Sequence, residues 1–117
     1  MMDGQLIIER QRAICQRFGA PYVACDLGLK VGVSRNVRYG AKPLNGLRVI
    51  PEGDTCGWYI WGGEEWSDDE DFFVPLHAHH LEKWAPLVLP YLGLAPGWRF
   101  LLADAYEDVW RDEQLAV

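Results

Sequence analysis

The densest group of side chains with metal-binding chemistry in this sequence is a histidine cluster, His77, His79 and His80, which holds every histidine of the chain. On a helix His77 and His80 would share a face, and on a strand His77 and His79 would. Imidazole binds zinc and other divalent metals, but this spacing is not a ligand motif such as HExxH, so carboxylates or cysteines would have to complete a site. We expect structural or capping histidines and no cofactor. A metal-binding protein or metal-dependent enzyme centred on the cluster is the alternative.

Adjacent carboxylates are a second group with catalytic chemistry, and they form the pairs Glu64/Glu65, Asp68/Asp69 and Glu107/Asp108. General acid–base catalysis needs two carboxylates in different environments, one of them with a pKa raised by burial. Neighbouring acids in a polar run stay hydrated and ionised. The chain also lacks the glycine pattern of a phosphate-binding loop and the G-x-S-x-G frame of a serine hydrolase. We therefore expect that the protein is not an enzyme.

Six carboxylates stand in the eight positions of residues 64–71, which we call the acidic segment. Residues 1–48 carry eight basic and three acidic side chains, whereas residues 49–117 carry three basic and fourteen acidic ones, so the net charges are +5 and −11. Nucleic acid is a poor partner for an acidic protein, because its binding depends on phosphate neutralisation. A basic protein is a good partner, because complementary fields speed association.

Aromatic side chains interrupt or flank the acidic segment, and aromatic anchors inside a charged rim are typical of protein interfaces. We predict a partner-binding surface made of Trp61, Glu64, Glu65, Trp66, Asp68, Asp69, Glu70 and Asp71. A solvated loop whose charge only aids solubility is one alternative. A homo-oligomer in which the same Trp-rich surface pairs with itself is another.

Arginines and cysteines carry the remaining polar chemistry. Arg35, Arg38 and Arg48 either form a small basic patch or pair with the protein's own carboxylates, at about 0–1 kcal/mol for each exposed pair. The three cysteines are Cys15, Cys25 and Cys56. Their odd number and the absence of CxxC spacing predict reduced, buried thiols instead of a disulfide framework or a zinc site.

Hydrophobic spacing predicts the elements of the first half of the chain. Apolar residues three, four and seven positions apart indicate a helix over residues 4–18. Residues 29–33 alternate between apolar and other side chains, as in a half-buried strand. Asn45-Gly46 is a strong turn signal, and residues 47–50 and 57–61 predict an antiparallel hairpin closed by a turn at residues 52–54.

The second half predicts a helix over residues 79–92, in which Pro86 and Pro90 impose a kink and a new turn. Residues 98–103 and 109–110 predict strands. We therefore expect an α+β fold: a single small domain with an N-terminal helix, a mainly antiparallel sheet and a second, proline-containing helix.

The length of 117 residues suits one domain spanning residues 1–117, and a hydrophobic content of 50% with six tryptophans excludes a disordered chain. No apolar run reaches the roughly 20 residues of a membrane helix, and the N-terminus lacks a secretory signal. We expect no membrane partner and a cytoplasmic location.

Four motifs of the later chain resemble a known family. They are GWYIWGGEE at residues 57–65, DFFVPLH with HL at residues 71–77 and 80–81, YLGLAPGWRFL at residues 91–101, and YEDVWRD at residues 106–112. Over roughly residues 29–115 the chain resembles small bacterial proteins classed as immunity-like domains, close to family thirty-three of the polymorphic-toxin immunity proteins.

The resemblance implies a cytoplasmic protein, encoded beside a secreted or contact-delivered toxin, that blocks the toxin by tight binding. It implies no catalytic residues, and it does not identify the toxin. An acidic inhibitor with exposed aromatic side chains suits a cationic toxin such as a nuclease. We therefore expect an immunity protein that binds and neutralises a cognate bacterial toxin through the acidic, aromatic-rich surface.

Overall fold

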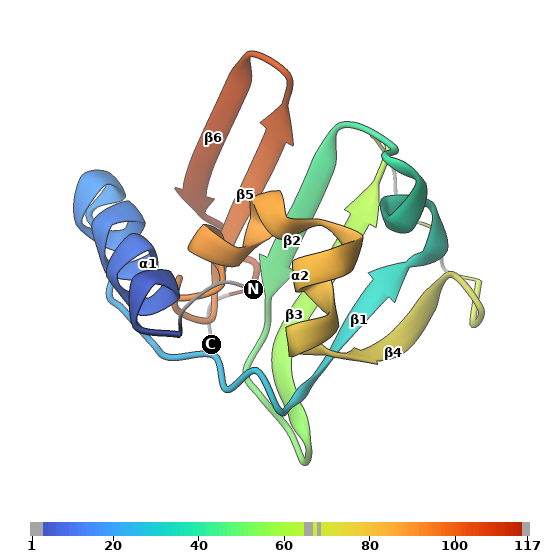
Figure 1. Ribbon diagram of the computed structural model, residues 1–117, viewed down its shortest axis with the longest axis horizontal. Helices are drawn as coiled ribbons and strands as arrows, with labels where there is room; N and C mark the ends of the chain where they lie inside the picture. The colour runs from blue at the N-terminus through green and yellow to red at the C-terminus, as the bar shows by residue number, and fades with distance from the viewer. Residues whose placement is uncertain (1–3, 65–66, 68, 116–117) are drawn as a thin grey trace.

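The computed structural model describes residues 4–64, 67 and 69–115, and its strands form one sheet (Figure 1). The strands are β1 (Lys30–Ser34), β2 (Leu44–Arg48), β3 (Thr55–Gly62), β4 (Phe73–His77), β5 (Trp98–Ala103) and β6 (Tyr106–Arg111). They lie in the order β4-β1-β3-β2-β5-β6. The β1–β3 pair is parallel and the other neighbouring pairs are antiparallel, which confirms the predicted α+β fold with a mainly antiparallel sheet.

The short helical segments of residues 78–91 lie over one face of this sheet, and the N-terminal helix lies beside them (Figure 1). The helices are α1 (Gly4–Phe18) and α2 (Leu81–Trp84), and the 3-10 helices are η1 (Arg35–Tyr39), η2 (Ala78–His80) and η3 (Pro86–Tyr91). The predicted N-terminal helix is confirmed at both its ends. Within residues 4–64, 67 and 69–115, no helix combines the length and the apolar character needed to cross a membrane.

A buried stripe on α1 docks this helix against η3 and the residues that follow it. Gln11 and Cys15 are buried in this stripe together with Ile7. The Gln11 Nε2 donates to the Leu89 carbonyl at 3.1 Å, and the Cys15 thiol donates to the Gly93 carbonyl at 3.4 Å. Because each buried polar group has a backbone partner, the helix is held in one position along η3.

The core lies between the inner face of the sheet and η3. The rings of Trp58 and Phe100 meet there at a centroid distance of 5.4 Å, and the Trp58 indole donates to the Leu92 carbonyl at 3.0 Å. Burying one tryptophan ring contributes about 4–6 kcal/mol of transfer free energy. Other fully buried members of this core are Val33, Val37, Ile60, Leu81, Val88, Leu89 and Leu94. These residues belong to one hydrophobic core cluster, which the sheet shares with η1, α2 and η3.

The second helical region is not one helix, because prolines divide it. The segment predicted as a helix over residues 79–92 consists of the end of η2, then α2, then η3. Ala85 leaves helical geometry at φ −160° and ψ 75°, directly before Pro86. A residue that precedes proline is driven out of the α region by contact with the proline ring. The predicted kink is thereby confirmed.

The predicted turn at Asn45-Gly46 is wrong, because both residues lie inside β2. A Cβ at Gly46 would lie 2.2 Å from the Phe100 ring, so the glycine is required by close packing and not by a turn. The Asn45 side chain donates to the Gly63 carbonyl at 2.8 Å. The other turn predicted here, at residues 52–54, is confirmed: it joins β2 to β3 in an antiparallel hairpin, and Gly53 has a φ of 57°.

Arg48 is 1% exposed and forms no ion pair within the described residues, so both alternatives predicted for it, a basic surface patch and an exposed ion pair, are wrong. Its guanidinium binds backbone carbonyls from three separate segments, and the burial lowers its pKa. The shorter of these hydrogen bonds go to Val23 at 2.8 Å, Leu94 at 2.8 Å, Cys56 at 2.9 Å and Ala24 at 3.2 Å. Arg48 therefore ties the chain after α1 and the chain after η3 to the sheet.

All three cysteines are free and buried, as predicted. Cys25, Cys56 and Arg48 line one pocket. The interaction with Cys56, and then burial, raises the pKa of Cys25, whereas the interaction with Cys25 lowers the pKa of Cys56. The two thiols therefore lie in the same buried region as the Arg48 guanidinium.

Candidate functional site

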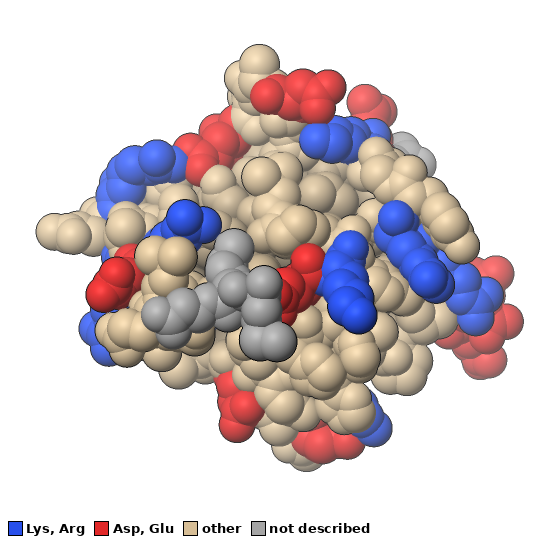
Figure 2. Space-filling model, in the orientation of Figure 1, with Lys and Arg blue, Asp and Glu red and all other residues tan. Residues whose placement is uncertain are grey.

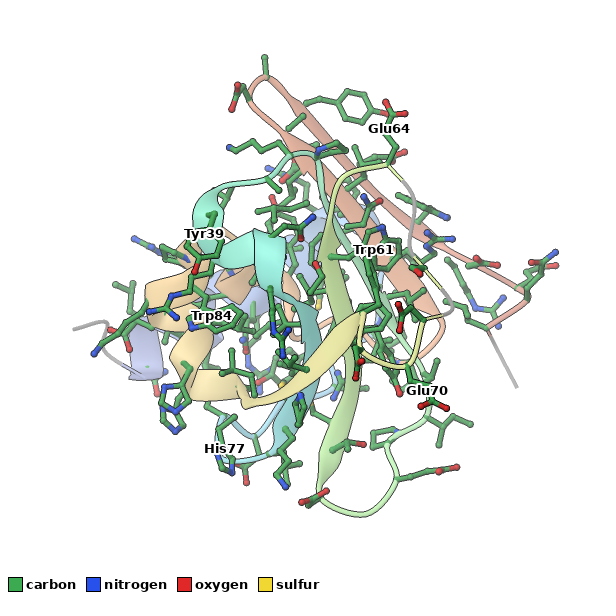
Figure 3. All side chains as sticks on the ribbon, turned by 90° about the vertical axis from the view of Figure 1, so that its right-hand side faces the viewer. Tyr39, Trp61, Glu64, Glu70, His77 and Trp84 are labelled. Carbon is green, nitrogen blue, oxygen red and sulfur yellow. The ribbon has the colours of Figure 1, made fainter. Side chains whose placement is uncertain are left out.

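Aromatic rings gather on the outer face of the sheet, opposite the helices (Figure 3). Tyr59 and Trp61 alternate with the inward-facing residues of β3, and both approach Phe73 of β4. The Phe73 centroid lies 5.2 Å from Tyr59, 6.3 Å from Trp61 and 4.8 Å from Phe72. Edge-to-face contacts of this kind hold aromatic side chains rigidly. Tyr59, Trp61, Phe72 and Phe73 thus form a rigid aromatic cluster, which we call the aromatic base, beneath the chain that leaves β3.

Trp61 lies within this base and not at the surface that the sequence predicted for it. Only 3% of the residue is exposed, and the Arg99 guanidinium lies 5.8 Å from its ring. The same guanidinium lies 5.2 Å from the ring of Trp110 and pairs with Asp112 at 3.2 Å. Trp61 therefore supports the outer surface from below, because its ring is packed in this cluster.

The acidic segment connects β3 to β4 and is exposed wherever the structure describes it. Glu64, Asp69, Glu70 and Asp71 are exposed, whereas Glu65, Trp66 and Asp68 lie outside the described residues. The Asp69 carboxylate accepts a hydrogen bond from the Asp71 amide at 3.0 Å, and the Asp69 carbonyl accepts one from the Phe72 amide at 3.0 Å. These contacts form a turn that presents the carboxylates to solvent.

The described carboxylates of the acidic segment have no cationic partner among residues 4–64, 67 and 69–115. The basic side chains that do form ion pairs bind acids elsewhere: Arg17 with Glu107, Lys30 with Asp54, Lys42 with Asp104, Arg99 with Asp112 and Arg111 with Glu113. Figure 3 places Glu64 and Glu70 on the same side of the molecule as Trp61. The negative charge of this segment is therefore not neutralised within the described protein.

A groove of about 940 Å³ opens beside the aromatic base. Its lining includes Tyr59, Phe73 and Ile50, together with the ion pair between Lys30 and Asp54 at 3.0 Å. This groove was not predicted from the sequence. Alternation in residues 57–61 indicates that Tyr59 shares a face with Trp61, but no local pattern reveals that β1 and β4 lie beside them.

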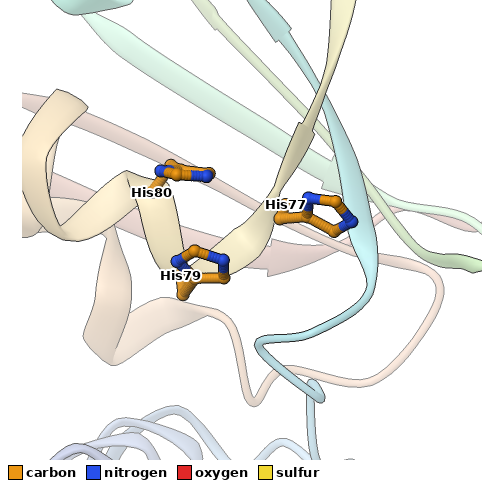
Figure 4. Close-up of side chains that lie close together, drawn as sticks. All are labelled: His77, His79 and His80. Atoms are coloured by element: carbon orange, nitrogen blue, oxygen red, sulfur yellow. The ribbon is translucent and has the colours of Figure 1, made fainter.

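The histidine cluster lies where β4 passes into η2 (Figure 4). All three side chains are exposed, and their nearest ligand nitrogens lie within 4.8 Å of one another. The rings of His79 and His80 are 4.1 Å apart at their centroids, and His77 stacks on His79 at 5.9 Å. Desolvation lowers the pKa of His80, and the charges of His79, His77 and Lys83 lower it further.

The expected capping role of these histidines is not what the structure shows. His77 precedes η2 and His80 precedes α2, but neither side chain makes a capping hydrogen bond. None of the three side chains is buried, so a packing role does not account for them either. The cluster is thus a set of exposed imidazoles with no structural task in the described chain.

A second surface combines basic and aromatic side chains on η1 and α2, and we call it the η1–α2 patch. Arg35, Arg38 and Lys83 are exposed, Tyr39 is 81% exposed, and the Arg38 guanidinium lies 5.6 Å from the ring of Trp84. Figure 2 shows basic side chains on the side of the molecule that carries α2 and η1. Figure 3 places Tyr39 and Trp84 on the opposite side from Glu64 and Glu70. The charge asymmetry of the sequence is therefore partly a spatial asymmetry.

Comparison with known proteins identifies the family. A family model described as the Imm33-like domain matches residues 10–112, which is nearly the whole chain. No curated protein and no solved structure gives a significant match. The matched range includes every strand of the sheet, the described part of the acidic segment and the histidine cluster. The chain therefore belongs to the Imm33-like domain family.

Proposed function

We propose that the chain is an immunity protein that neutralises a cognate bacterial toxin by binding it through the acidic segment. Membership of the Imm33-like domain family supports the class of function. The observation that carries the site is that Glu64, Asp69, Glu70 and Asp71 are exposed and form no ion pair within the described chain. Glu65, Trp66 and Asp68 belong to the proposed surface on sequence grounds.

The clustered carboxylates give this surface a role in the first encounter with a basic toxin. Four described charges within eight positions act together, because their spacing is comparable to the Debye length of about 8 Å at physiological ionic strength. Complementary fields of this kind raise association rates by roughly 10- to 1,000-fold, and salt weakens them. The proposal therefore requires association that is strongly salt-dependent.

The groove supplies the apolar area that tight binding needs. A stable interface buries about 1,200–2,000 Å² in total, which is more than one acidic turn can provide. Tyr59 is 38% exposed and Ile50 is 50% exposed, and both line the groove, whose lining also includes Phe73, two residues after the acidic segment. In this arrangement the carboxylates govern association, while apolar contacts in the groove govern dissociation. Trp61 keeps the base rigid without contacting the toxin.

The proposal also places the protein in the cytoplasm, with a basic protein toxin as its partner and no part for nucleic acid or a membrane. Inhibition follows from occupation of the toxin surface, so no catalytic residue is assigned. A homo-oligomer built through the same surface would compete with toxin binding. Light scattering at several concentrations, with and without the toxin, separates the two arrangements.

The experiment compares two double variants that change the charge equally. One carries Glu70→Gln and Asp71→Asn in the acidic segment. The matched control carries Glu9→Gln and Asp26→Asn, which are exposed carboxylates on α1 and in the chain that follows it. The partner is the toxin domain encoded next to this chain, and the readouts are the association rate at two salt concentrations and the rescue of toxin-arrested growth.

We expect the acidic-segment variant to associate about tenfold more slowly at low salt and to lose most of its salt dependence. The control should stay within about twofold of the native rate, because its charges lie away from the proposed contact. Equal slowing of both variants would mean that only net charge matters. In that case the proposed surface is wrong even if the protein still protects cells.

A further inference from the structure

We propose that His77, His79 and His80 form a surface site for a divalent transition metal ion of the zinc, nickel and copper group. The three imidazoles come from one short stretch, where β4 ends and η2 begins, and all are exposed (Figure 4). Neutral imidazole is a preferred ligand of these ions, whereas magnesium and calcium prefer oxygen ligands. The chemistry of the cluster thus selects the class of ion.

The backbone beneath the cluster is fixed, so the ligands start close to a common point. The Ala78 amide donates to the Leu29 carbonyl at 2.8 Å, and the His79 amide donates to the Leu27 carbonyl at 2.9 Å. His77 lies opposite Lys30 in the β1–β4 ladder. The chain therefore enters and leaves the cluster along a defined path, and only the side-chain torsions remain free.

The distances allow coordination after small side-chain rotations. The ligand nitrogens lie within 4.8 Å of one another. Two nitrogens bound to one tetrahedral zinc ion lie roughly 3.3 Å apart, because each zinc–nitrogen bond is about 2.0–2.1 Å long. Closing this gap needs a movement of about 1.5 Å at most for one pair, which rotation about the first two torsions of an exposed histidine provides.

Around the cluster the described chain supplies nearby charges, Lys83 beside His80 and Asp54 near His77, but no bonded partner for these rings. No hydrogen bond or ion pair within residues 4–64, 67 and 69–115 involves the side chains of the cluster, and neither His77 nor His80 caps the helix that follows it. Three imidazoles leave at least one coordination position for water or for a group from another molecule. The site is thus open, as a recruiting or bridging metal site would be.

This site lies at the opposite end of β4 from the acidic segment, although His77 is next to the groove through its strand partner Lys30. β4 begins at Phe73 in the aromatic base and ends at His77, and five extended residues span about 14 Å. The metal proposal therefore does not depend on toxin binding, and a failure of one leaves the other standing.

The chain offers a sharp test, because it contains no histidine outside the cluster. Protein free of any affinity tag is titrated by calorimetry with zinc, nickel and copper(II) salts, and with magnesium as the negative control. Imidazole signals in the NMR spectrum of the same sample come only from these three residues. We expect one ion per chain, no heat with magnesium, and shifts or broadening of all three imidazole signals.

Variants assign the ligands. We expect His79→Asn to weaken metal binding by about tenfold or more. Removing a residue that only hydrogen-bonds to a metal ligand already lowers metal affinity by about 10- to 100-fold, and His79 would be a ligand itself. The triple variant His77→Asn, His79→Asn, His80→Asn should abolish binding while retaining the native circular dichroism spectrum, because all three side chains are exposed. If the triple variant fails to fold, the metal affinity of the His79→Asn variant still tests the proposal. Undiminished binding in His79→Asn, or no binding by the native chain, overturns the proposal.

Discussion

Replacing Arg48 by lysine tests whether one buried guanidinium fastens the periphery of the fold to the sheet. The guanidinium spans carbonyls of Val23, Ala24, Cys56 and Leu94, which lie on different segments. The guanidinium donates from three nitrogens, Nε, Nη1 and Nη2. A lysine ammonium donates from a single nitrogen, so it cannot reach all of these carbonyls at once. We expect Arg48→Lys to keep about half of these contacts.

The size of the effect follows from the carbonyls that lose a donor. About two buried acceptors would be left unsatisfied, each at a cost of about 1–3 kcal/mol. The expected loss is therefore about 2–6 kcal/mol, a large part of the roughly 5–15 kcal/mol that stabilises a domain. For a chain of this length each kcal/mol corresponds to about 4 °C, so the melting temperature should fall by about 8–24 °C.

Urea unfolding followed by tryptophan fluorescence and by circular dichroism measures this loss. Arg38→Lys is the matched control, because Arg38 is exposed and its replacement should change the free energy of unfolding by no more than about 0.5 kcal/mol. A native-like stability for Arg48→Lys, within about 0.5 kcal/mol and with an unchanged denaturant slope, would refute the reasoning. The carbonyls would then have donors other than Arg48.

Two further changes probe the core and its rim. Gly46→Ala should destabilise the fold by about 1–3 kcal/mol or more in urea unfolding, because the new Cβ would lie 2.2 Å from the buried Phe100 ring. Gly4→Ala meets no atom within 4 Å and should be neutral or stabilising; similar losses for both would mean that the contact with Phe100 is not the cause. Burial, and then the hydrogen bond to Glu107, raises the pKa of Tyr91, so the stability that this tyrosine contributes is complete below about pH 10 and is lost as the pH rises further. Tyr91→Phe should flatten this alkaline decline, and an unaltered decline would show that another group causes it.

The sequence predicted those helices and strands whose hydrophobic periodicity and bounding turns lie within the segment itself. The helix over residues 4–18 and the strand over residues 98–103 have the predicted bounds, because periodicity and bounding turns define both. No element was predicted for residues 73–77, which form β4. Pro75 weakens a strand pattern there, and it is tolerated in β4 because β4 is an edge strand of the sheet. Edge position is a property of the assembled sheet, so residues 73–77 alone do not reveal it.

In the candidate site, too, local properties could be predicted from the sequence, whereas properties that depend on the assembled sheet could not. Exposure of Glu64, Asp69, Glu70 and Asp71 could be predicted, because adjacent carboxylates are costly to bury. The burial of Trp61 could not, because it depends on Phe73 and Arg99, which reach it only through the pairing of distant strands. Clustering of the histidines follows from their positions in sequence, whereas their exposure depends on where η2 lies on the sheet.

The strand order has a consequence for how the chain reaches its working form. β2–β3 and β5–β6 are contiguous hairpins, whereas the β1–β3, β1–β4 and β2–β5 pairs join strands that are distant in sequence. Pairing of distant strands is slow, because the intervening chain must lose entropy before any contact forms. We expect the two hairpins to close early and β4 to join late. An immunity protein built in this way would protect its cell only after the last strand has joined the sheet, because β4 completes the surface beside the acidic segment.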